Sequence, residues 1–491
     1  MNDQQPRPFS PHRTMAALLI PLFASLLSIS IVNVALPAIE DGLGAQSADL
    51  QWVLSGYALA FGVALVPAGR AGDVWGRRRI FLIGVAFFGL SSLLAALAPT
   101  PILLNAARVL MGLGAGMLVP QIIGMIQRLF TGAARGRAYG MMSTVIGVAV
   151  AAGPAVGGLL IDVTDPQIGW RLTFLINVPV VFIALLFAWI WLPRTSQEAV
   201  QGDPSHDDAA TADADPRGPR GIRGLDPVGV VLLAAAVVLL MLPFIQFRSL
   251  FGAVLAGLGA LLLAGWIVWE RRLGLRDPAE PMVNLALFTL PSFTWNSAVL
   301  SLYFSGMPAV WAIVAIYVQQ GLGHGALIAG VVTLPSAVMM VLFGAQVGRR
   351  APRIGPQMLV GGTVVAVASM LALAGAAALM DTELGSLWWV GVALGLNGLS
   401  QVLIIPTAQT LSMQDVPEQM AGAAGGVAQT AQRIFTAVGI AVVTAIYFTV
   451  VGSAGHQAGI IAGSLVIAGL MVVSVVAALF AARRARRTRS G

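Results

Sequence analysis

The chain has 491 residues, of which 57% are hydrophobic and 10% are charged, and its mean hydropathy is +0.85. Soluble domains carry about 25% charged residues, so this composition excludes an ordinary soluble protein and predicts a polytopic membrane protein. The formal net charge is +7, all 28 basic residues are arginines, and the absence of cysteine excludes disulfides, thiolate metal sites and cysteine nucleophiles.

Apolar runs of about 20 residues with few charges predict fourteen membrane-spanning helices. Their approximate cores are residues 15–38, 51–69, 80–98, 102–127, 138–161, 171–192, 227–246, 250–269, 292–318, 327–347, 356–380, 387–411, 421–450 and 457–482. The start of the chain is polar, and the first apolar run is too long for the core of a signal peptide. We therefore expect residues 1–14 to form a cytoplasmic tail and the first run to be retained as a span.

The arginines predict the orientation of these spans. If both termini are cytoplasmic, 24 of the 28 arginines lie on the cytoplasmic side. Arg171 and Arg248 then lie outside, while Arg108 and Arg433 lie within spans. Because cytoplasmic loops are enriched in basic residues, the pattern predicts a multi-pass membrane protein with both ends inside. The charge balance thus indicates membrane topology and gives no reason to expect nucleic-acid binding.

The composition also divides the chain into segments. In order, these are a six-helix bundle over residues 15–192, a disordered cytoplasmic linker over 193–226, an inserted helical hairpin over 227–269, a cytoplasmic loop over 270–291, a second six-helix bundle over 292–482 and a basic cytoplasmic tail over 483–491. The tail is expected to meet anionic lipid at the inner face of the membrane.

The two six-span blocks are predicted to be repeats. Gly344 and the arginines 349, 350 and 353 stand between the second and third spans of the second block, as Gly69 and the arginines 77–79 do in the first. Gly348 stands where the first block has Asp73. Parallel repeats of six helices with a central site between them are a transporter architecture.

Three motifs carry a resemblance to a known family. The loop motif of residues 69–79, GRAGDVWGRRR, contains Gly69, Asp73, Gly76, Arg77 and Arg78; Arg108 and Gly112 lie in the fourth predicted span; Gly153, Pro154, Gly157 and Gly158 lie in the fifth. With these residues the chain resembles the major facilitator superfamily, and within it the fourteen-helix drug:proton antiporter branch.

The resemblance implies an all-α membrane protein with the major facilitator fold, in which two six-helix bundles and an inserted two-helix hairpin make fourteen transmembrane helices. It also implies a secondary active exporter that moves amphipathic drugs or metabolites across the bacterial inner membrane by alternating access. The residues of the loop motif are then expected to form a conformational gate. The partners implied are a small-molecule substrate, protons and membrane lipid, without nucleic acid, and the protein is expected to be a monomer.

The chain departs from that branch at the acid of the first span. Residues 33–37, beginning with Asn33, match the Asn-Val-Ala-Leu-Pro segment of the branch, but Ser28 stands where an aspartate is usual. The acids and histidines of the chain can be placed in loops or at span ends, so no ordinary proton-titrating side chain is expected near the midplane. Arginine stays protonated and cannot shuttle protons. Ser28, Asn33, Arg108 and Gly112 are therefore the candidates for coupling, by a route that differs from the usual one.

Polar and aromatic residues within the spans are candidates for lining a substrate cavity. They are Tyr57, Gln121, Asn296, Tyr303, Trp311, Asn397, Gln401, Gln429 and Arg433. Each could equally be a residue that packs helices together. Arg433 is the most suggestive of them, because a charge within the membrane is costly and marks a functional candidate.

Two alternative functions remain open on the sequence. One is an exporter of a lipid or of an anionic or neutral metabolite with different coupling, which the missing acid at Ser28 favours. The other, more remote, is a membrane-embedded enzyme. Against an enzyme stand the lack of cysteine, the placement of the four histidines in loops and the absence of a glycine-rich nucleotide loop. We expect no enzymatic activity, no cofactor and no metal site.

Overall fold

The computed structural model describes residues 10–193, 226–246, 250–276, 281–324 and 326–490. All regular secondary structure in these ranges is helical. Most of the predicted tail 1–14, nearly all of the predicted linker 193–226, and Arg248 lie outside the described residues.

The first part of the chain forms α1 (Pro11–Leu43), α2 (Ser47–Trp75), α3 (Arg77–Ala96), α4 (Pro101–Leu129), α5 (Gly132–Val163), α6 (Pro166–Leu175) and α7 (Asn177–Trp191). The helices α9 (Pro227–Gln246) and α10 (Leu250–Arg276) follow. The last part forms α11 (Pro291–Ile316), α12 (Ala326–Ala378), α13 (Leu387–Ser412) and α14 (Ala421–Ser490). Three short helical turns, η2 (Leu285–Thr289), η3 (Tyr317–Gly321) and η4 (Glu418–Met420), lie between these helices.

Local chemistry sets several of the helix ends. At the start of α4, the Thr100 side chain accepts a hydrogen bond from the Leu103 N–H at 3.4 Å, and Pro101 occupies the first turn. The Ser386 hydroxyl caps α13 in the same way by accepting from the Trp388 N–H at 3.3 Å. Such caps satisfy N–H groups that a helix start leaves without partners. Gly76, with φ of +95°, makes the sharp turn from α2 to α3, a conformation that side chains disfavour.

Ten helices among the described residues are long and apolar enough to cross a membrane. Two pairs of predicted spans share one helix each. In α12, residues 327–347 and 356–380 lie on either side of a kink at Ile354, where φ is −125° and ψ is 18°. In α14, residues 421–450 and 457–482 lie on either side of a kink at Gly455, where φ is 81° and ψ is 174°.

Other predicted boundaries differ in detail. The predicted span 171–192 begins in α6 and continues in α7. The helix α9 is a shorter apolar helix, and α10 runs on to Arg276, beyond the predicted hairpin end at residue 269. Apolar content fixes where a helix crosses the membrane but not where it ends, because polar residues continue a helix beyond the apolar region without cost.

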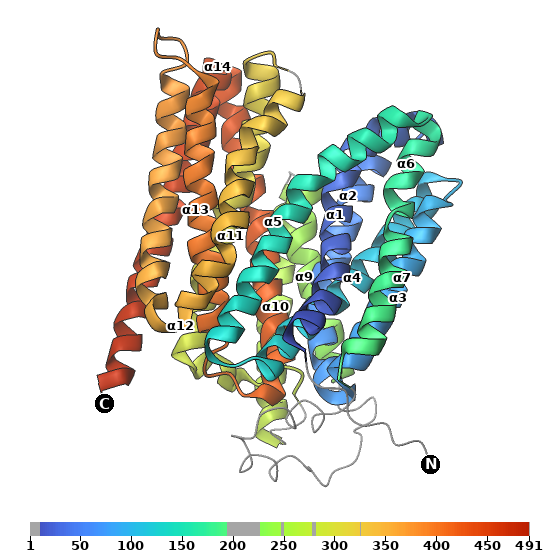
Figure 1. Cartoon of the computed structure of the whole chain (residues 1–491), viewed down its shortest axis with the longest axis vertical. Helices are drawn as coiled ribbons and strands as arrows, with labels where there is room; N and C mark the ends of the chain where they lie inside the picture. Colours follow the sequence, from blue (N-terminus) through green and yellow to red (C-terminus); the bar gives the residue numbers. More distant parts are fainter. Residues whose placement is uncertain (1–9, 194–225, 247–249, 277–280, 325, 491) are drawn as a thin grey trace.

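The helices form two groups, as Figure 1 shows. Helices α1–α7, coloured blue to green, make one group, and α11–α14, coloured yellow to red, make the other, with α9 packed against both α2 and α14. The groups lie closest together at the end where α1 begins and α14 ends, and their ribbons diverge toward the opposite end. One apolar core fills the first group and includes Met413 and Ala424 of the second, while a separate core fills the rest of the second group.

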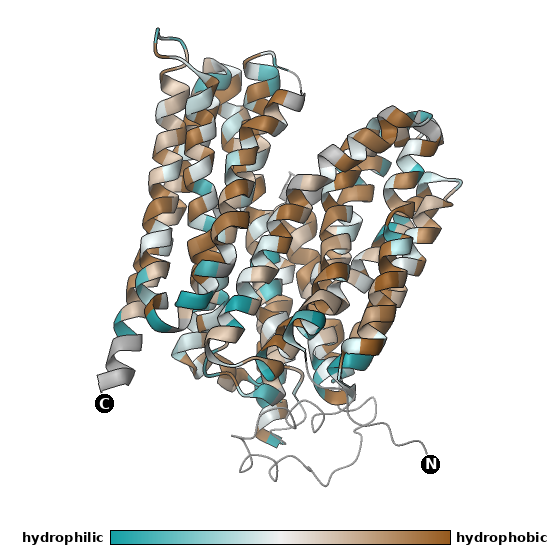
Figure 2. Cartoon of the chain, in the orientation of Figure 1, coloured by the Kyte–Doolittle hydropathy of each residue, from teal (hydrophilic) through white to brown (hydrophobic). Residues whose placement is uncertain are grey.

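The outer faces of the helices are apolar. Large hydrophobic side chains are exposed there, including Phe182 (69%), Leu261 (69%) and Trp388 (77%). Figure 2 shows hydrophobic colours along most of each helix, with hydrophilic residues gathered toward the end where α1 begins and α14 ends. Such a surface suits the hydrocarbon core of a membrane. Backbone groups there must be hydrogen-bonded within the protein, and helices meet this requirement.

Candidate functional site

The end of α2 is tied to the start of α14 by the carboxylate of Asp73. Its side chain is 3% exposed, and its Oδ2 accepts a hydrogen bond from the Ala423 N–H at 2.9 Å. Its Oδ1 lies 3.2 Å from Nη2 of Arg77, with which it forms an ion pair. The Arg77 guanidinium also donates to the carbonyls of Gly124 and Glu418. A negative charge at the N-terminus of a helix is favourable because the helix dipole is positive there.

Glycines bring these backbones close enough for the contact. A Cβ on Gly69 would collide with the carbonyl of Gly422, and a Cβ on Gly422 would lie 2.5 Å from Oδ1 of Asp73. A Cβ on Gly72 would collide with the amide of Gln121. The motif therefore requires small residues for the close approach of α2 to α14 at Gly69 and to α4 at Gly72, in addition to the turn at residue 76.

The repeated motif lies on the equivalent seam, between α12 and α5. A Cβ on Gly348 would collide with the carbonyl of Gly136, and one on Gly344 would collide with the hydroxyl of Thr144. The Thr144 hydroxyl also lies 3.3 Å from the carbonyl of Met340, as a donor. The two repeats thus make two related seams, α2 on α14 and α12 on α5, and the second has a glycine in place of the carboxylate.

Further contacts join the two groups. The Gln127 side chain donates to the Met413 carbonyl at 2.5 Å, and the Thr430 hydroxyl lies 3.3 Å from the Gly62 carbonyl. Sequence reasoning missed Gln127, because a glutamine within a span carries no signal of a partner 286 residues away.

Arg108 lies within the first group and is 1% exposed. Its Nε donates to the Val53 carbonyl at 2.8 Å, and its Nη1 lies 3.4 Å from both the carbonyl and the hydroxyl oxygen of Ser28. The guanidinium carbon stands 4.4 Å from the ring centre of Tyr57, whose hydroxyl donates to the Ser25 carbonyl at 2.9 Å. The structure thus brings Ser28 and Arg108 together. Among the described residues, no carboxylate forms an ion pair with this buried cation.

Arg433 reaches the same helix from the other group. Its guanidinium carbon lies 4.5 Å from the ring centre of Phe61, and Phe61 stacks on Tyr57 with ring centres 6.3 Å apart. The Nε of Arg433 is buried and has no hydrogen-bond partner. Two guanidinium groups therefore flank one aromatic pair on α2, and cation–π contacts stabilise both.

The motif of the fifth span packs α5 on α1. A Cβ on Gly153 would collide with the hydroxyl of Ser30, and one on Gly157 would lie 3.0 Å from the carbonyl of Ile31. Ser30 in turn lies 3.2 Å from the Ala149 carbonyl as a donor. Gly158 faces open space, so it is not needed for this contact. Small residues let two helices approach closely in a membrane.

The remaining motif residues have simpler surroundings. Gly112 packs under the Tyr57 carbonyl, which a Cβ would strike. The Asn33 amide donates to the Ile29 and Ser30 carbonyls of its own helix, at 3.2 Å each. Pro154 lies within α5. Arg78 stands over the ring of Trp189, at 5.3 Å from the ring centre, and donates to the Trp189 carbonyl at 2.9 Å.

The predicted cavity residues have varied surroundings. Gln121 donates to the Ala68 carbonyl at 2.7 Å, and Asn296 donates to the Ser292 carbonyl of its own helix at 2.7 Å. The side-chain oxygen Oδ1 of Asn397 accepts from Nε2 of Gln401 at 2.6 Å. Of the other predicted cavity residues, Tyr57, Tyr303 and Gln429 are buried. Trp311 and Arg433 are partly exposed.

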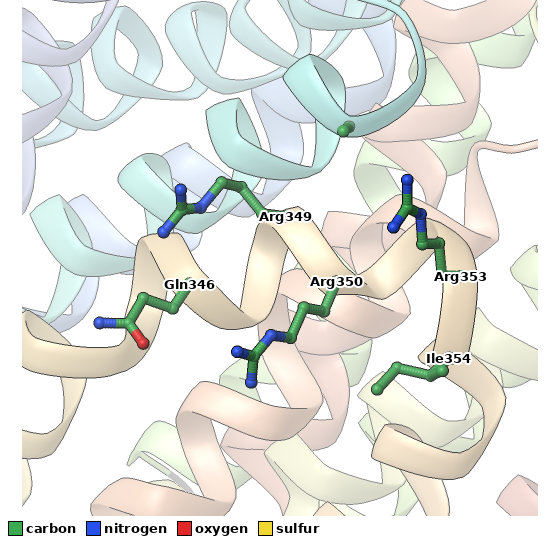
Figure 3. Close-up of a pocket in the computed structure, with 6 residues that line it drawn as sticks. Gln346, Arg349, Arg350, Arg353 and Ile354 are labelled. Atoms are coloured by element: carbon green, nitrogen blue, oxygen red, sulfur yellow. The ribbon is translucent and has the colours of Figure 1, made fainter.

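One described cavity lies elsewhere, at the junction of α12 and α5, and has a volume of about 440 Å³. It is lined by Ala133, Gln346, Arg349, Arg350, Arg353 and Ile354, and it includes no predicted cavity residue (Figure 3).

Sequence reasoning also missed two buried acids at the base of α9 and α10. Asp226 is 5% exposed and Glu270 is 1% exposed, although both were expected in loops or at span ends. Asp226 accepts from the Gly229 N–H at 3.1 Å and from Nε1 of Trp269 at 3.0 Å. Glu270 accepts from the Val283 N–H at 3.3 Å. Their sequence positions at helix ends agree with the prediction, but their burial depends on packing that no local pattern reveals.

The fold and its seams define a transporter of two related helical groups. Residues 18–440 match the family model described as Major Facilitator Superfamily, so the chain belongs to the major facilitator superfamily. It is accordingly a transporter and not an enzyme, and a multi-pass protein of the bacterial inner membrane.

Two similar sequences come from Streptomyces. The chain is 30% identical to a probable actinorhodin transporter of Streptomyces coelicolor, over 91% of this chain and 74% of the relative. It is 31% identical to a tetracenomycin C resistance and export protein of Streptomyces glaucescens, over 90% of this chain and 77% of the relative.

A solved structure has the same fold. The human organic anion transporter MFSD10 superposes with a TM-score of 0.63 at 15% identity, over 96% of this chain and 100% of that chain.

Proposed function

We propose that the protein is a secondary active exporter that moves amphipathic drugs or metabolites out of the cell by alternating access. Two relatives support this cargo class, one named as a probable actinorhodin transporter and the other as a tetracenomycin C resistance and export protein. The apolar character of the spans, with few polar groups among them, suits amphipathic molecules.

The proposed architecture has fourteen transmembrane helices and cytoplasmic termini. The kinks at Ile354 and Gly455 would divide α12 and α14 into two spans each. Helices α9 and α10, which pack against each other, would form the inserted hairpin between bundles 15–192 and 292–482. The linker 193–226, the loop 270–291 and the tail 483–491 would lie in the cytoplasm, and the protein would act as a monomer.

The contacts between the two bundles support a gate at the cytoplasmic side. The contact from Asp73 to Ala423 joins the bundles at the end where α1 begins and α14 ends. With cytoplasmic termini, this end would be the inner one, and a state with this contact would be closed toward the cytoplasm. Release of the Asp73 contact would then accompany opening to the cytoplasm. The one observation that carries the proposal is this carboxylate of one bundle capping a helix of the other.

Proton coupling, if the protein uses it, must differ from the usual scheme of the branch. At the acid position stands Ser28, whose hydroxyl faces the Arg108 guanidinium at 3.4 Å. A serine cannot release a proton there, and an arginine keeps its own. Coupling would then come from an acid closer to the membrane surface, such as Asp73.

A second cargo class, anionic or neutral metabolites, is favoured by one observation. Arg108 and Arg433 flank Tyr57 and Phe61, and the Nε of Arg433 is buried without a partner. A cationic drug would meet two positive charges there, whereas an anionic or neutral molecule would not be repelled.

Transport by purified protein in lipid vesicles tests the proposal. Vesicles with an imposed pH gradient would be offered cationic, neutral and anionic amphipathic dyes in parallel. We expect gradient-dependent transport of at least one dye, with the anionic or neutral dye preferred over the cationic one. Transport of none of them with correctly inserted protein would contradict the exporter assignment. Strong transport of the cationic dye alone would contradict the second cargo class.

A further inference from the structure

The cavity between α12 and α5 has a composition that the transport cycle does not explain. Three of its six lining residues are arginines, Arg349, Arg350 and Arg353, and none is acidic. In Figure 3, Arg349 and Arg353 extend from α12 toward the start of α5, and Arg350 extends to the other side of its helix. Arg349 and Arg353 are four residues apart and therefore neighbours on one helix face.

The cavity also lies across the seam between the two bundles. Ala133 belongs to the first turn of α5, and the other five lining residues belong to α12. The first turn of a helix presents N–H groups without helical partners and a positive dipole end. The cavity therefore collects positive charge from both sides of the seam.

Comparison of the two repeats shows what this seam lacks. On the α2–α14 seam, Asp73 supplies a negative charge that pairs with Arg77 and caps the start of α14. On the α12–α5 seam, Gly348 stands in that place and packs against the Gly136 carbonyl. The basic residues of the motif are retained here, but the acid is not.

We propose that the phosphate of an anionic phospholipid headgroup occupies this cavity and bridges Arg349 and Arg353 to the start of α5. The planar guanidinium group binds phosphate oxygens in pairs, which suits this role. Basic pockets between membrane helices on the cytoplasmic side bind such headgroups. All six lining residues are exposed, so the cavity is open to its surroundings, as access for a lipid headgroup requires.

The surface beside the cavity favours a lipid over free phosphate. Ile354 at its edge is 46% exposed, and Leu342 and Phe343, earlier on the same helix, are 56% and 38% exposed. These side chains offer an apolar path for acyl chains next to the charged cavity. The bound lipid would hold the α12–α5 seam closed, as Asp73 holds the other. This last step rests on the proposed alternating access, whereas the binding itself does not.

Binding can be measured on the full-length protein by native mass spectrometry after removal of lipid. Phosphatidylglycerol, phosphatidylcholine and inorganic phosphate would be added separately to wild type, to the R349Q/R353Q double variant and to an R271Q/R272Q control. The control removes the same charge from exposed positions on α10. We expect phosphatidylglycerol to bind wild type and control alike and to bind R349Q/R353Q at least tenfold more weakly.

Three results would overturn the proposal. These are equal binding of phosphatidylglycerol by wild type and R349Q/R353Q, equal binding of phosphatidylcholine and phosphatidylglycerol by wild type, and binding of inorganic phosphate as tight as that of the lipid. None of these measurements uses transport, so loss of the exporter assignment and loss of the lipid site can be told apart.

Spin labelling tests whether the bound lipid holds the α12–α5 seam closed. Because the natural chain has no cysteine, spin labels can be attached at Ala134→Cys on α5 and Gln357→Cys on α12. Both positions are exposed. Phosphatidylglycerol should increase the population with the shorter distance in the otherwise wild-type protein and leave R349Q/R353Q unchanged. A distance distribution that does not respond to the lipid, or responds equally in both proteins, would contradict the bridging role.

Discussion

Asp73 makes contacts both within its own bundle and to the other bundle. Its carboxylate pairs with Arg77 on its own side and accepts from the Ala423 N–H of the other bundle at 2.9 Å. A buried hydrogen bond to a charged group contributes about 1.5–3 kcal/mol. The seam between α2 and α14 thus depends on one buried carboxylate and on the close approach of Gly69 to Gly422.

Replacement of Asp73 by asparagine should weaken this seam. The amide oxygen can still accept from Ala423, but the ion pair with Arg77 is lost. We expect transport in vesicles to fall several-fold while membrane insertion and expression stay at wild-type levels. Asp49→Asn is a suitable control, because Asp49 makes a comparable bond to the Gln46 N–H at the other end of the same helix. Wild-type transport by D73N, or an equal loss in D49N, would contradict the gate role.

Ser28 is the position at which the chain departs from the antiporter branch that it resembles. Its hydroxyl lies 3.4 Å from Nη1 of Arg108, close enough for an introduced carboxylate to pair with the guanidinium. Ser28→Asp should therefore neutralise the buried cation and increase gradient-dependent efflux of ethidium by several-fold.

Ser28→Asn has nearly the same shape as Ser28→Asp without the charge, and it should leave ethidium efflux at the wild-type level. Fluorescence of ethidium in cells or vesicles distinguishes the two variants. Equal efflux by both would show that the missing acid does not decide charge preference.

At the scale of elements, the two seams are built by glycines at close approach. Gly348 on α12 faces the Gly136 carbonyl of α5, and Gly69 on α2 faces the Gly422 carbonyl of α14. The two seams are related by the repeat, because α12 is the counterpart of α2 and the first half of α14 is the counterpart of α5. The sequence repeat predicted the correspondence of the two loops, and the structure adds the partner helix of each.

Gly348→Ala should force the α12–α5 seam apart. The added methyl group would strike the Gly136 carbonyl, and such overpacking costs about 1–3 kcal/mol. Gly361→Ala is a matched control on the same helix, because nothing lies within 4 Å of its added Cβ. Alanine also favours a helix over glycine by up to about 1 kcal/mol, so the control should be neutral or stabilising. Thermal unfolding in detergent should show a lower midpoint for G348A only, and equal midpoints would exclude a tight seam.

The limits of sequence reasoning follow from the distances along the chain. Apolar runs placed most helices because membrane insertion depends on local composition, which a single segment carries. The contact from Asp73 to Ala423 joins residues 350 positions apart, and neither segment carries a pattern that indicates the other as its partner. The pairing of Ser28 with Arg108 could be anticipated only through the family resemblance, since the two residues lie 80 positions apart. The sequence did not predict the cavity at Arg349 and Arg353, because the positive-inside rule alone explains a cluster of arginines in a cytoplasmic loop.

At the scale of the whole molecule, the proposed transport cycle needs two states, and the structure has the arrangement of one of them. Its bundles are joined at the end where α1 begins and α14 ends, and they diverge at the other end (Figure 1). Alternating access requires a second state in which this relation is reversed. The energetic difference between the states must be small, since a cargo or a proton can shift the equilibrium only by its differential affinity for the two.

Spin-label distances at both ends of the molecule test this central claim most directly. One labelled pair, Ala134→Cys with Gln357→Cys, reports on the inner seam. A second pair, Glu40→Cys on α1 with Gln320→Cys on η3, reports on the opposite end, and both of its positions are exposed. Introducing Asp73→Asn should produce a population with a longer inner distance and a shorter outer distance. Unchanged distances in D73N, or a lengthening at both ends together, would contradict the account.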